Sequence, residues 1–159
     1  MDTTSSTQSV PRALLLILRL HLGTILLLTD LGKLTRPHAF VAEMLGFVQP
    51  MLQRASAPYA AFLRDVVIPH ASLFSHLVMT GELTAALSLL TGTLTRLGAG
   101  IAMFLFLNYM LAKGRIFWSP DSEDAAVFFS ALVVLLGAAG RSFGVDRYLH
   151  RRWPRAWLW

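Results

Sequence analysis

The sequence has 159 residues, of which 55% are hydrophobic and only 14% are charged, with a formal net charge of +5 and no cysteine. A soluble domain of one compact unit usually has about a quarter of its residues charged, so this chain cannot cover itself with polar surface. The lack of cysteine excludes disulfides, iron–sulfur clusters, thiolate zinc sites and paired-thiol redox chemistry. We therefore predict an all-α integral membrane protein and not a soluble helical enzyme.

Four apolar runs predict helices that span the membrane. They cover about residues 11–34, 70–93, 97–113 and 124–140. A polar segment over residues 1–10, which we expect to be a disordered tail, precedes Pro11 at the start of the first run. The last two runs are shorter than the roughly 20 residues that a bilayer requires, so flanking anchors such as Trp118 would complete them. The pattern predicts one four-helix transmembrane domain over residues 11–140.

An amphipathic segment over about residues 38–67 connects the first two runs. At about 100° per residue its first helix has an apolar face and a polar face. The apolar face carries Phe40, Val41, Met44, Leu45, Phe47, Val48, Met51 and Leu52, and the polar face carries Glu43, Gln49, Gln53 and Arg54. Pro50 should bend this helix. A second short helix after Pro58 would group Tyr59, Phe62, Leu63 and Val66. Such a segment is predicted to lie in the interface plane as a cap, unless it serves only as a connection.

Residues 141–159 form a basic, aromatic tail. It contains five arginines and a single acid, Asp146, together with Trp153, Trp157 and Trp159. A basic patch can indicate nucleic acid, but arginine and tryptophan beside an apolar helix are typical of a cytoplasmic membrane edge. With four spans, both termini would then be cytoplasmic, in a bacterial-type inner membrane, and we expect no nucleic-acid partner.

Charged side chains inside a span need a partner or a function, because each costs about 2.5–3.5 kcal/mol on insertion scales. On the first run Arg19, Asp30 and Lys33 share one stripe, which should face the interior of the bundle. His21 lies on the opposite side, so we expect it to face lipid or a partner protein. His21 and His76 differ in depth by about 16 Å, which argues against a haem held by both. No metal site is predicted.

Glu82, near the middle of the second run, is the most informative polar residue. At 1.5 Å per residue, Arg19 lies about 10 Å and Glu82 about 20 Å from the cytoplasmic ends of their helices, so the two should not pair. The hairpin between the second and third runs brings Asn108, Tyr109 and Lys113 to the depth of Glu82. We therefore predict that Glu82 contacts one of these three, with Lys33 as the next choice. The contact can be a structural staple or a proton site.

Small residues indicate which helix faces pack closely. In the second run these are Gly81, Ala85, Ser88 and Gly92, and in the fourth Ala126, Ser130 and Gly137. We assign them packing roles and no chemistry.

Three stretches of the chain resemble the DoxX/DoxD family of small membrane proteins. They are RLHLGTILLLTDLGKL, GELTAALSLLTGTLTRLGAG and DAAVFFSALVVLLGAAGRSFGVD, in this order along the chain. The resemblance implies four spans with both ends cytoplasmic and, through DoxD, a link to thiosulfate:quinone oxidoreductase. It matches Arg19, Gly23, Gly32, Lys33, Gly81, Glu82, Thr95, Arg96, Gly140, Arg141, Ser142 and Asp146. This chain has no soluble redox domain, which separates it from a stand-alone thiosulfate oxidoreductase.

Two hypotheses of different classes follow. In the first, the protein is a membrane subunit of an electron-transfer complex, and a quinone or a lipid binds without a covalent link in a pocket between Glu82, Lys33 and Lys113. In the second, it is a structural subunit of a membrane assembly, with His21, Trp153, Trp157 and Trp159 as contact residues. The sequence contains no complete set of catalytic residues. Under both hypotheses we therefore predict a non-catalytic subunit and not a stand-alone oxidoreductase.

Overall fold

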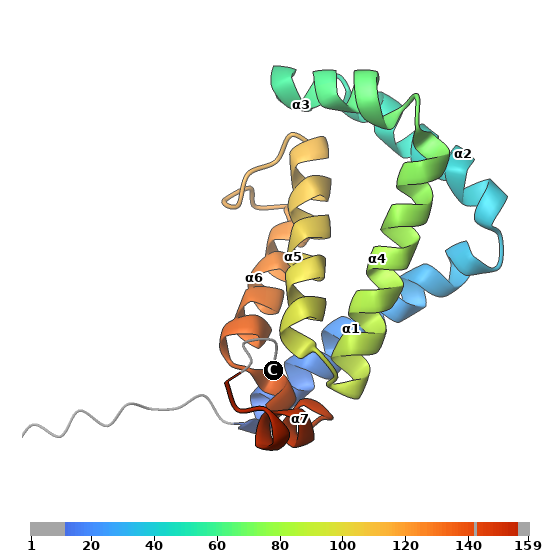
Figure 1. Ribbon diagram of the computed structural model, residues 1–159. Coiled ribbons are helices and arrows are strands. Elements are labelled where there is room, and N and C mark those ends of the chain that lie inside the picture. The colour runs from blue at the N-terminus through green and yellow to red at the C-terminus, as the bar shows by residue number, and fades with distance from the viewer. Residues whose placement is uncertain (1–11, 142, 156–159) are drawn as a thin grey trace, which may run out of the picture.

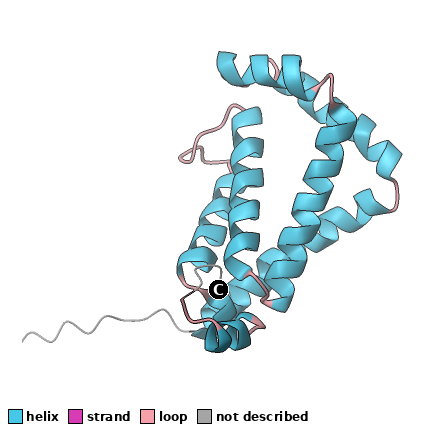
Figure 2. Cartoon of the chain, in the orientation of Figure 1, coloured by secondary structure: helices cyan, strands magenta, loops and turns pink. Residues whose placement is uncertain are grey.

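The computed structural model describes residues 12–141 and 143–155, and this part of the chain consists of helices joined by loops and turns, without a strand (Figures 1 and 2). The predicted tail over residues 1–10, Pro11, and the last two tryptophans lie outside the described residues. The long helices are α1 (Arg12–Leu34), α4 (Ala71–Thr91), α5 (Thr95–Ala112) and α6 (Glu123–Leu136). The shorter elements are α2 (Pro37–Met51), α3 (Ala57–Phe62) with a π-helical turn (Leu63–Val67), a 3-10 turn (Ala139–Arg141) and α7 (Asp146–Arg152).

Three of these helices are long and apolar enough to cross a membrane, namely Arg12–Lys33, Ala71–Thr91 and Thr95–Ala112. They coincide with the first three predicted spans, which confirms an all-helical membrane protein. The fourth predicted span forms α6, whose 14 residues make it shorter than a helix that crosses a bilayer unaided.

Helix ends follow from a few local signals. Gly92 ends α4 in the left-handed conformation, with φ of 69°, which glycine adopts without a steric penalty. Ser122 begins α6, where its hydroxyl accepts a hydrogen bond from the Ala125 N–H at 3.3 Å. Glu123 and Asp124 follow in the first turn, where acidic side chains interact favourably with the helix dipole.

The hydrophobic side chains form two clusters. One lies where α1, α4, α5 and α6 meet, and its fully buried centre is made of small and aliphatic residues. The other lies beneath α2 and α3 and includes Phe40, Met44, Val48, Leu63 and Val67. We call α2, α3 and the π-helical turn the cap, because they cross one end of the bundle (Figure 1).

Helices α4 and α5 run antiparallel, lie close together at their short connection and diverge toward the cap (Figure 1). At the connection Gly98 of α5 packs against Ser88 of α4 so closely that a Cβ on Gly98 would overlap the serine side chain. The Ser88 hydroxyl also donates to the carbonyl oxygens of Thr93 at 2.7 Å and Leu94 at 2.9 Å. The small residues predicted on the second run therefore hold one end of the hairpin closed.

The cap differs from two predictions, one about its apolar face and one about the effect of Pro50. Val66 is exposed and Val67 is buried instead, because the π-helical turn holds one more residue per turn and shifts the buried face by one position. Pro50 lies in the last turn of α2, so the helix ends there at Met51, where a bend had been predicted.

The packing face of α6 follows the prediction only in part. Gly137 packs so closely on Leu15 of α1 that a Cβ would overlap the leucine side chain, whereas Ala126 is exposed and Ala131 and Val134 are buried. Asp124 is also buried, in an ion pair with Lys113.

Candidate ligand-binding site

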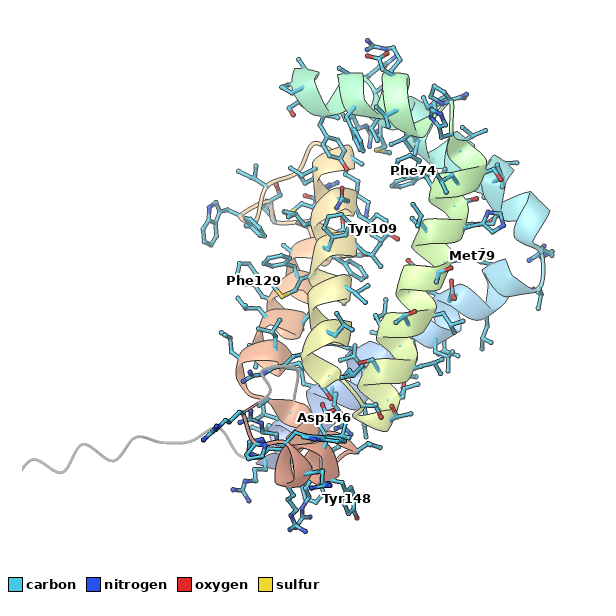
Figure 3. The ribbon with its side chains drawn as sticks, in the orientation of Figure 1. Phe74, Met79, Tyr109, Phe129, Asp146 and Tyr148 are labelled. Atoms are coloured by element: carbon cyan, nitrogen blue, oxygen red, sulfur yellow. The ribbon has the colours of Figure 1, made fainter. Side chains whose placement is uncertain are left out.

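A cavity of about 990 Å³ lies between α4 and α5 beneath the cap. Its walls are mainly apolar and come from α1 to α6 and the π-helical turn. They include Phe40, Met44 and Phe47 of α2, Tyr59 and Phe62 of α3, Phe74, Leu77, Val78, Gly81 and Glu82 of α4, Leu97, Gly100, Ile101, Phe104, Leu105, Asn108 and Tyr109 of α5, and Lys33 of α1. Figure 3 shows Phe74 on α4 and Tyr109 on α5 near the end where these helices diverge.

A polar group on the cavity wall is centred on Glu82. The Tyr109 hydroxyl donates to Oε1 of Glu82 at 2.7 Å, and Lys33 Nζ forms an ion pair with Oε2. Glu82 is buried, and the Lys33 ammonium also lies 5.0 Å from the centre of the Phe40 ring. The predicted contact of Glu82 with Tyr109 is confirmed, and Lys33, the next choice, is a second partner. We call Lys33, Glu82 and Tyr109 the polar cluster.

Asp30 lies behind this cluster and does not line the cavity. It is fully buried, with 0% of its surface exposed, and neither carboxylate oxygen has a hydrogen-bond partner among the described residues. It interacts electrostatically with both Glu82 and Lys33. A buried carboxyl group is stabilised either by protonation or by a nearby cation, and Lys33 is the cation that acts on Asp30.

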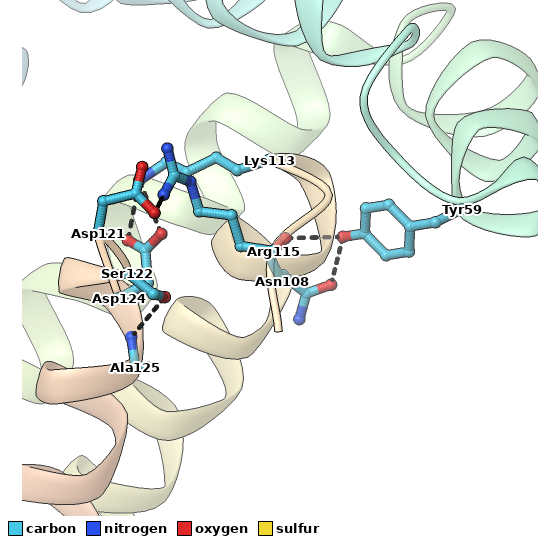
Figure 4. A network of polar contacts seen from close by, with 8 residues as sticks. All are labelled: Tyr59, Asn108, Lys113, Arg115, Asp121, Ser122, Asp124 and Ala125. Carbon is cyan, nitrogen blue, oxygen red and sulfur yellow. Dashed lines mark hydrogen bonds and ion pairs between the residues drawn. The ribbon is translucent and has the colours of Figure 1, made fainter. Parts of the chain in front are cut away.

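Lys113 lines the cavity but does not contact Glu82. Its Nζ instead binds both carboxylate oxygens of Asp124, at 2.7 and 3.0 Å (Figure 4). A short loop joins α5 to α6, so Asp124 lies only eleven positions after Lys113 in the sequence. The charge of Lys113 is therefore balanced by a close neighbour in the chain. Arg115 and Asp121 form another ion pair in the same turn, and the Arg115 guanidinium lowers the pKa of the exposed Asp121 carboxyl.

Asn108 joins the cap to α5 and does not reach Glu82. The Tyr59 hydroxyl donates to its side-chain oxygen at 2.9 Å and its carbonyl oxygen at 3.2 Å (Figure 4). Burial raises the pKa of Tyr59, since the phenolate would lose solvation there. Nearby, Gly114 lies so close to the Arg54 carbonyl that a Cβ would overlap it. The cap is therefore docked on α5 through a hydrogen bond and a close backbone contact.

Arg19 is not part of the polar cluster, so its inclusion among the site residues was wrong. Its guanidinium donates to the Phe143 carbonyl at 2.6 Å and the Ala139 carbonyl at 3.4 Å, and it interacts electrostatically with Asp146. Asp146 is buried between α7 and the α4–α5 connection (Figure 3). The C-terminal segment folds back onto the bundle and supplies these acceptors.

The residues expected to face a partner are only partly described. His21 is exposed on α1, and Trp153 is 54% exposed at the end of α7. Trp157 and Trp159 lie outside the described residues. Within the described ranges, no group of three or more metal-ligating side chains comes together.

The contacts of three residues were not predicted from the sequence, namely those of Tyr59, Asp124 and Asp146. Asp124 carried a usable signal, since Ser122, Glu123 and Asp124 mark a helix start within reach of Lys113. Asp146 stood out as the single acid of the basic tail and as a residue that the resemblance matches. Neither Asp146 nor Tyr59 had a predicted partner, because their contacts depend on how the C-terminal segment and the cap fold back.

Three helices long and apolar enough to cross a bilayer indicate an integral membrane protein. A model of the DoxX family matches residues 14–114, which is more than half of the chain and includes α1 to α5. The protein therefore belongs to the DoxX family. Neither a search of curated proteins nor a search of solved structures finds a match.

Proposed function

We propose that this DoxX protein is a small membrane subunit that binds the headgroup of a quinone in its cavity. One observation carries the proposal: an apolar cavity of about 990 Å³ between potential spanning helices ends on Lys33, Glu82 and Tyr109. Ligand pockets are usually apolar with a few polar groups that orient the ligand, and 300–1,000 Å³ is their ordinary size range.

The polar cluster matches the chemistry of a quinone headgroup. Quinone carbonyl oxygens accept hydrogen bonds and carry no charge. An ammonium has three N–H donors, and Glu82 occupies one on Lys33, so the others are available to a ligand oxygen. Phe40, Phe47 and Phe74 line the cavity and suit a flat aromatic ring.

The proposed setting is a four-span bundle in a bacterial-type inner membrane, with both termini cytoplasmic. In this arrangement α6 is the fourth span, extended by the turns at either end. The arginines of α7 then lie at the cytoplasmic surface, next to the α4–α5 connection, which agrees with the positive-inside rule. A partner subunit would donate the electrons if the bound quinone is reduced.

Quinone retention tests the proposal directly. The full chain is purified in mild detergent, its extractable quinone is quantified, and it is titrated with a quinone after reconstitution into nanodiscs. We expect the purified protein to retain quinone. Tyr109→Phe should lower the affinity for quinone about tenfold, because it removes the hydrogen bond from Tyr109 to Glu82. Lys33→Met should lower the affinity further. Arg64→Gln is the control, because Arg64 is exposed on the cap away from the cavity. Wild-type protein that binds no quinone, or Lys33→Met that binds as well as Arg64→Gln, contradicts the proposal.

A structural subunit without a ligand is the second candidate. It is favoured by the two ion pairs that tie neighbouring helices together, Lys33–Glu82 between α1 and α4 and Lys113–Asp124 between α5 and α6. Such pairs can fix helix register without chemistry. Co-purification with other membrane subunits, without any quinone, is the result that selects this function. A free monomer in mild detergent contradicts it.

A further inference from the structure

The cavity continues beyond the polar cluster as a groove between α4 and α5. This groove is lined by Leu77 and Gly81 of α4 and by Leu97, Gly100 and Phe104 of α5. On α5 it extends from Tyr109 to Leu97, a separation of twelve residues or about 18 Å at the rise of an α-helix. The intervening residues of α5, up to Leu107, include no polar or charged side chain. A ligand in this part of the groove would therefore contact mainly hydrocarbon, up to Arg96, which lines the cavity at the end nearest the α4–α5 connection.

The groove opens sideways between α4 and α5. Leu77, Leu97 and Phe104 are 56%, 43% and 66% exposed, and they lie on helices long and apolar enough to cross the bilayer. On the cap side, Phe40 and Leu63 are buried, whereas Phe47 and Phe62 are partly exposed. Lipid therefore covers the opening between α4 and α5 in the membrane.

The shape of the groove favours a single flexible chain over a helix of another protein. The two helices diverge toward the cap and meet at the connection, where Gly98 touches Ser88 (Figure 1). A helix with side chains is about 10–12 Å wide and cannot enter a space that closes in this way. A hydrocarbon tail can follow the taper.

We propose that the groove holds the isoprenoid tail of the ligand, a long-tailed membrane quinone that enters sideways from the bilayer. The inference rests on the proposed function, because the same ligand places its headgroup at the polar cluster. Affinity alone is a poor measure of the tail contact, since lipid solvates a tail as well as an apolar groove does. The position of the tail is the better measure.

The test uses a quinone analogue with a photoreactive group in its tail, bound to the full chain in nanodiscs. After illumination, labelled peptides are located by mass spectrometry. We expect label on residues 97–104 of α5 and 77–81 of α4. Gly100→Leu should reduce this label about tenfold, because the new side chain takes up part of the groove and competes with the tail for the space. Binding of a tail-less quinone at the polar cluster should not change.

Gly100→Leu is compatible with the fold. A Cβ at Gly100 meets no atom nearer than Leu135 Cδ1 at 4.0 Å, and leucine is a better helix former than glycine. Gly32→Leu on α1 is the matched control, since nothing lies within 4 Å of its Cβ position and it does not line the cavity. Gly81→Leu is a second blocking variant, whose Cβ would meet Leu105 at an ordinary 3.4 Å.

The outcomes separate the two proposals. Label confined to the cap or to the outer face of α1, or equal label in Gly100→Leu and Gly32→Leu, overturns the tail groove while headgroup binding stands. A wild-type protein that binds neither the analogue nor a tail-less quinone overturns both.

Discussion

The carboxylate of Asp146 accepts a hydrogen bond from the backbone N–H of Leu94 at 2.6 Å. A second bond comes from the Thr95 N–H at 2.8 Å, so one side chain binds two of the free donors at the start of α5. Leu94 has φ of 51°, in the left-handed region that a leucine adopts only under constraint. The C-terminal segment therefore fixes the α4–α5 connection, the point from which the two helices diverge around the cavity.

Asp146→Ala should destabilise the protein by about 3 kcal/mol, because it removes two hydrogen bonds to a charged acceptor and leaves the Leu94 conformation unsupported. Asp146→Asn should lose less, since one acceptor oxygen remains. Unfolding in detergent, followed by circular dichroism, measures the difference. Arg147→Gln is the control, as Arg147 is the exposed neighbour on the same helix. Equal stability of Asp146→Ala and the control would show that the carboxylate does not hold the connection.

Gly98→Ala tests the close contact that shuts the hairpin. The added methyl group overlaps the Ser88 side chain and lies 3.3 Å from the Ala85 carbonyl oxygen, so the helices must separate at a cost of about 1–3 kcal/mol. A glycine in a helix is otherwise improved by alanine, by about 1 kcal/mol. Gly46→Ala provides this reference, because nothing lies near its Cβ position. The unfolding free energies of the two variants should therefore change in opposite directions.

Depth counting along the helices was enough to predict part of the site. It placed Tyr109 at the level of Glu82 and separated Glu82 from Arg19, and both statements agree with the contacts. It worked because helix rise is constant and the three-residue connection between α4 and α5 leaves the hairpin little freedom in register. The choice among Asn108, Tyr109 and Lys113 depended on competing partners, which depth alone does not reveal.

The remaining contacts depend on segments that fold back. Tyr59 reaches Asn108 only because the cap crosses the end of α5, and Asp146 reaches Leu94 only because the chain turns after α6. The shift from Val66 to Val67 arises from a π-helical turn, which a fixed angle of about 100° per residue cannot represent. The cavity itself could not be predicted, because it results from the angle between two helices.

Docking of the cap should weaken at alkaline pH through Tyr59. Burial raises the pKa of Tyr59, so its neutral form is favoured in the folded protein. The stabilisation is therefore complete below the ordinary tyrosine value of about 10 and is lost as the pH rises through the higher folded value. Tyr59→Phe should remove this dependence and cost about 1 kcal/mol at neutral pH.

The measurement is phenolate absorbance and unfolding free energy between neutral and strongly alkaline pH. Tyr148→Phe is the control, because Tyr148 is exposed on α7, far from the cap (Figure 3). If the alkaline loss of stability is the same in Tyr59→Phe as in wild type, another group causes it.

Removal of Lys33 should do more damage than removal of Glu82. Lys33→Met leaves the buried carboxylates of Glu82 and Asp30 without their cation, and loss of one partner of a buried pair costs about 3–5 kcal/mol. In Glu82→Gln, Lys33 keeps Asp30 as a counter-ion and Tyr109 keeps an acceptor, so we expect a loss of about 1–2 kcal/mol. Addition of Asp30→Asn and Glu82→Gln to Lys33→Met should recover most of the stability, because no unpaired charge remains. The four unfolding free energies, measured under one detergent condition, decide the matter. Equal losses in Lys33→Met and Glu82→Gln, without recovery in the triple variant, contradict the role of Asp30 as a second counter-ion.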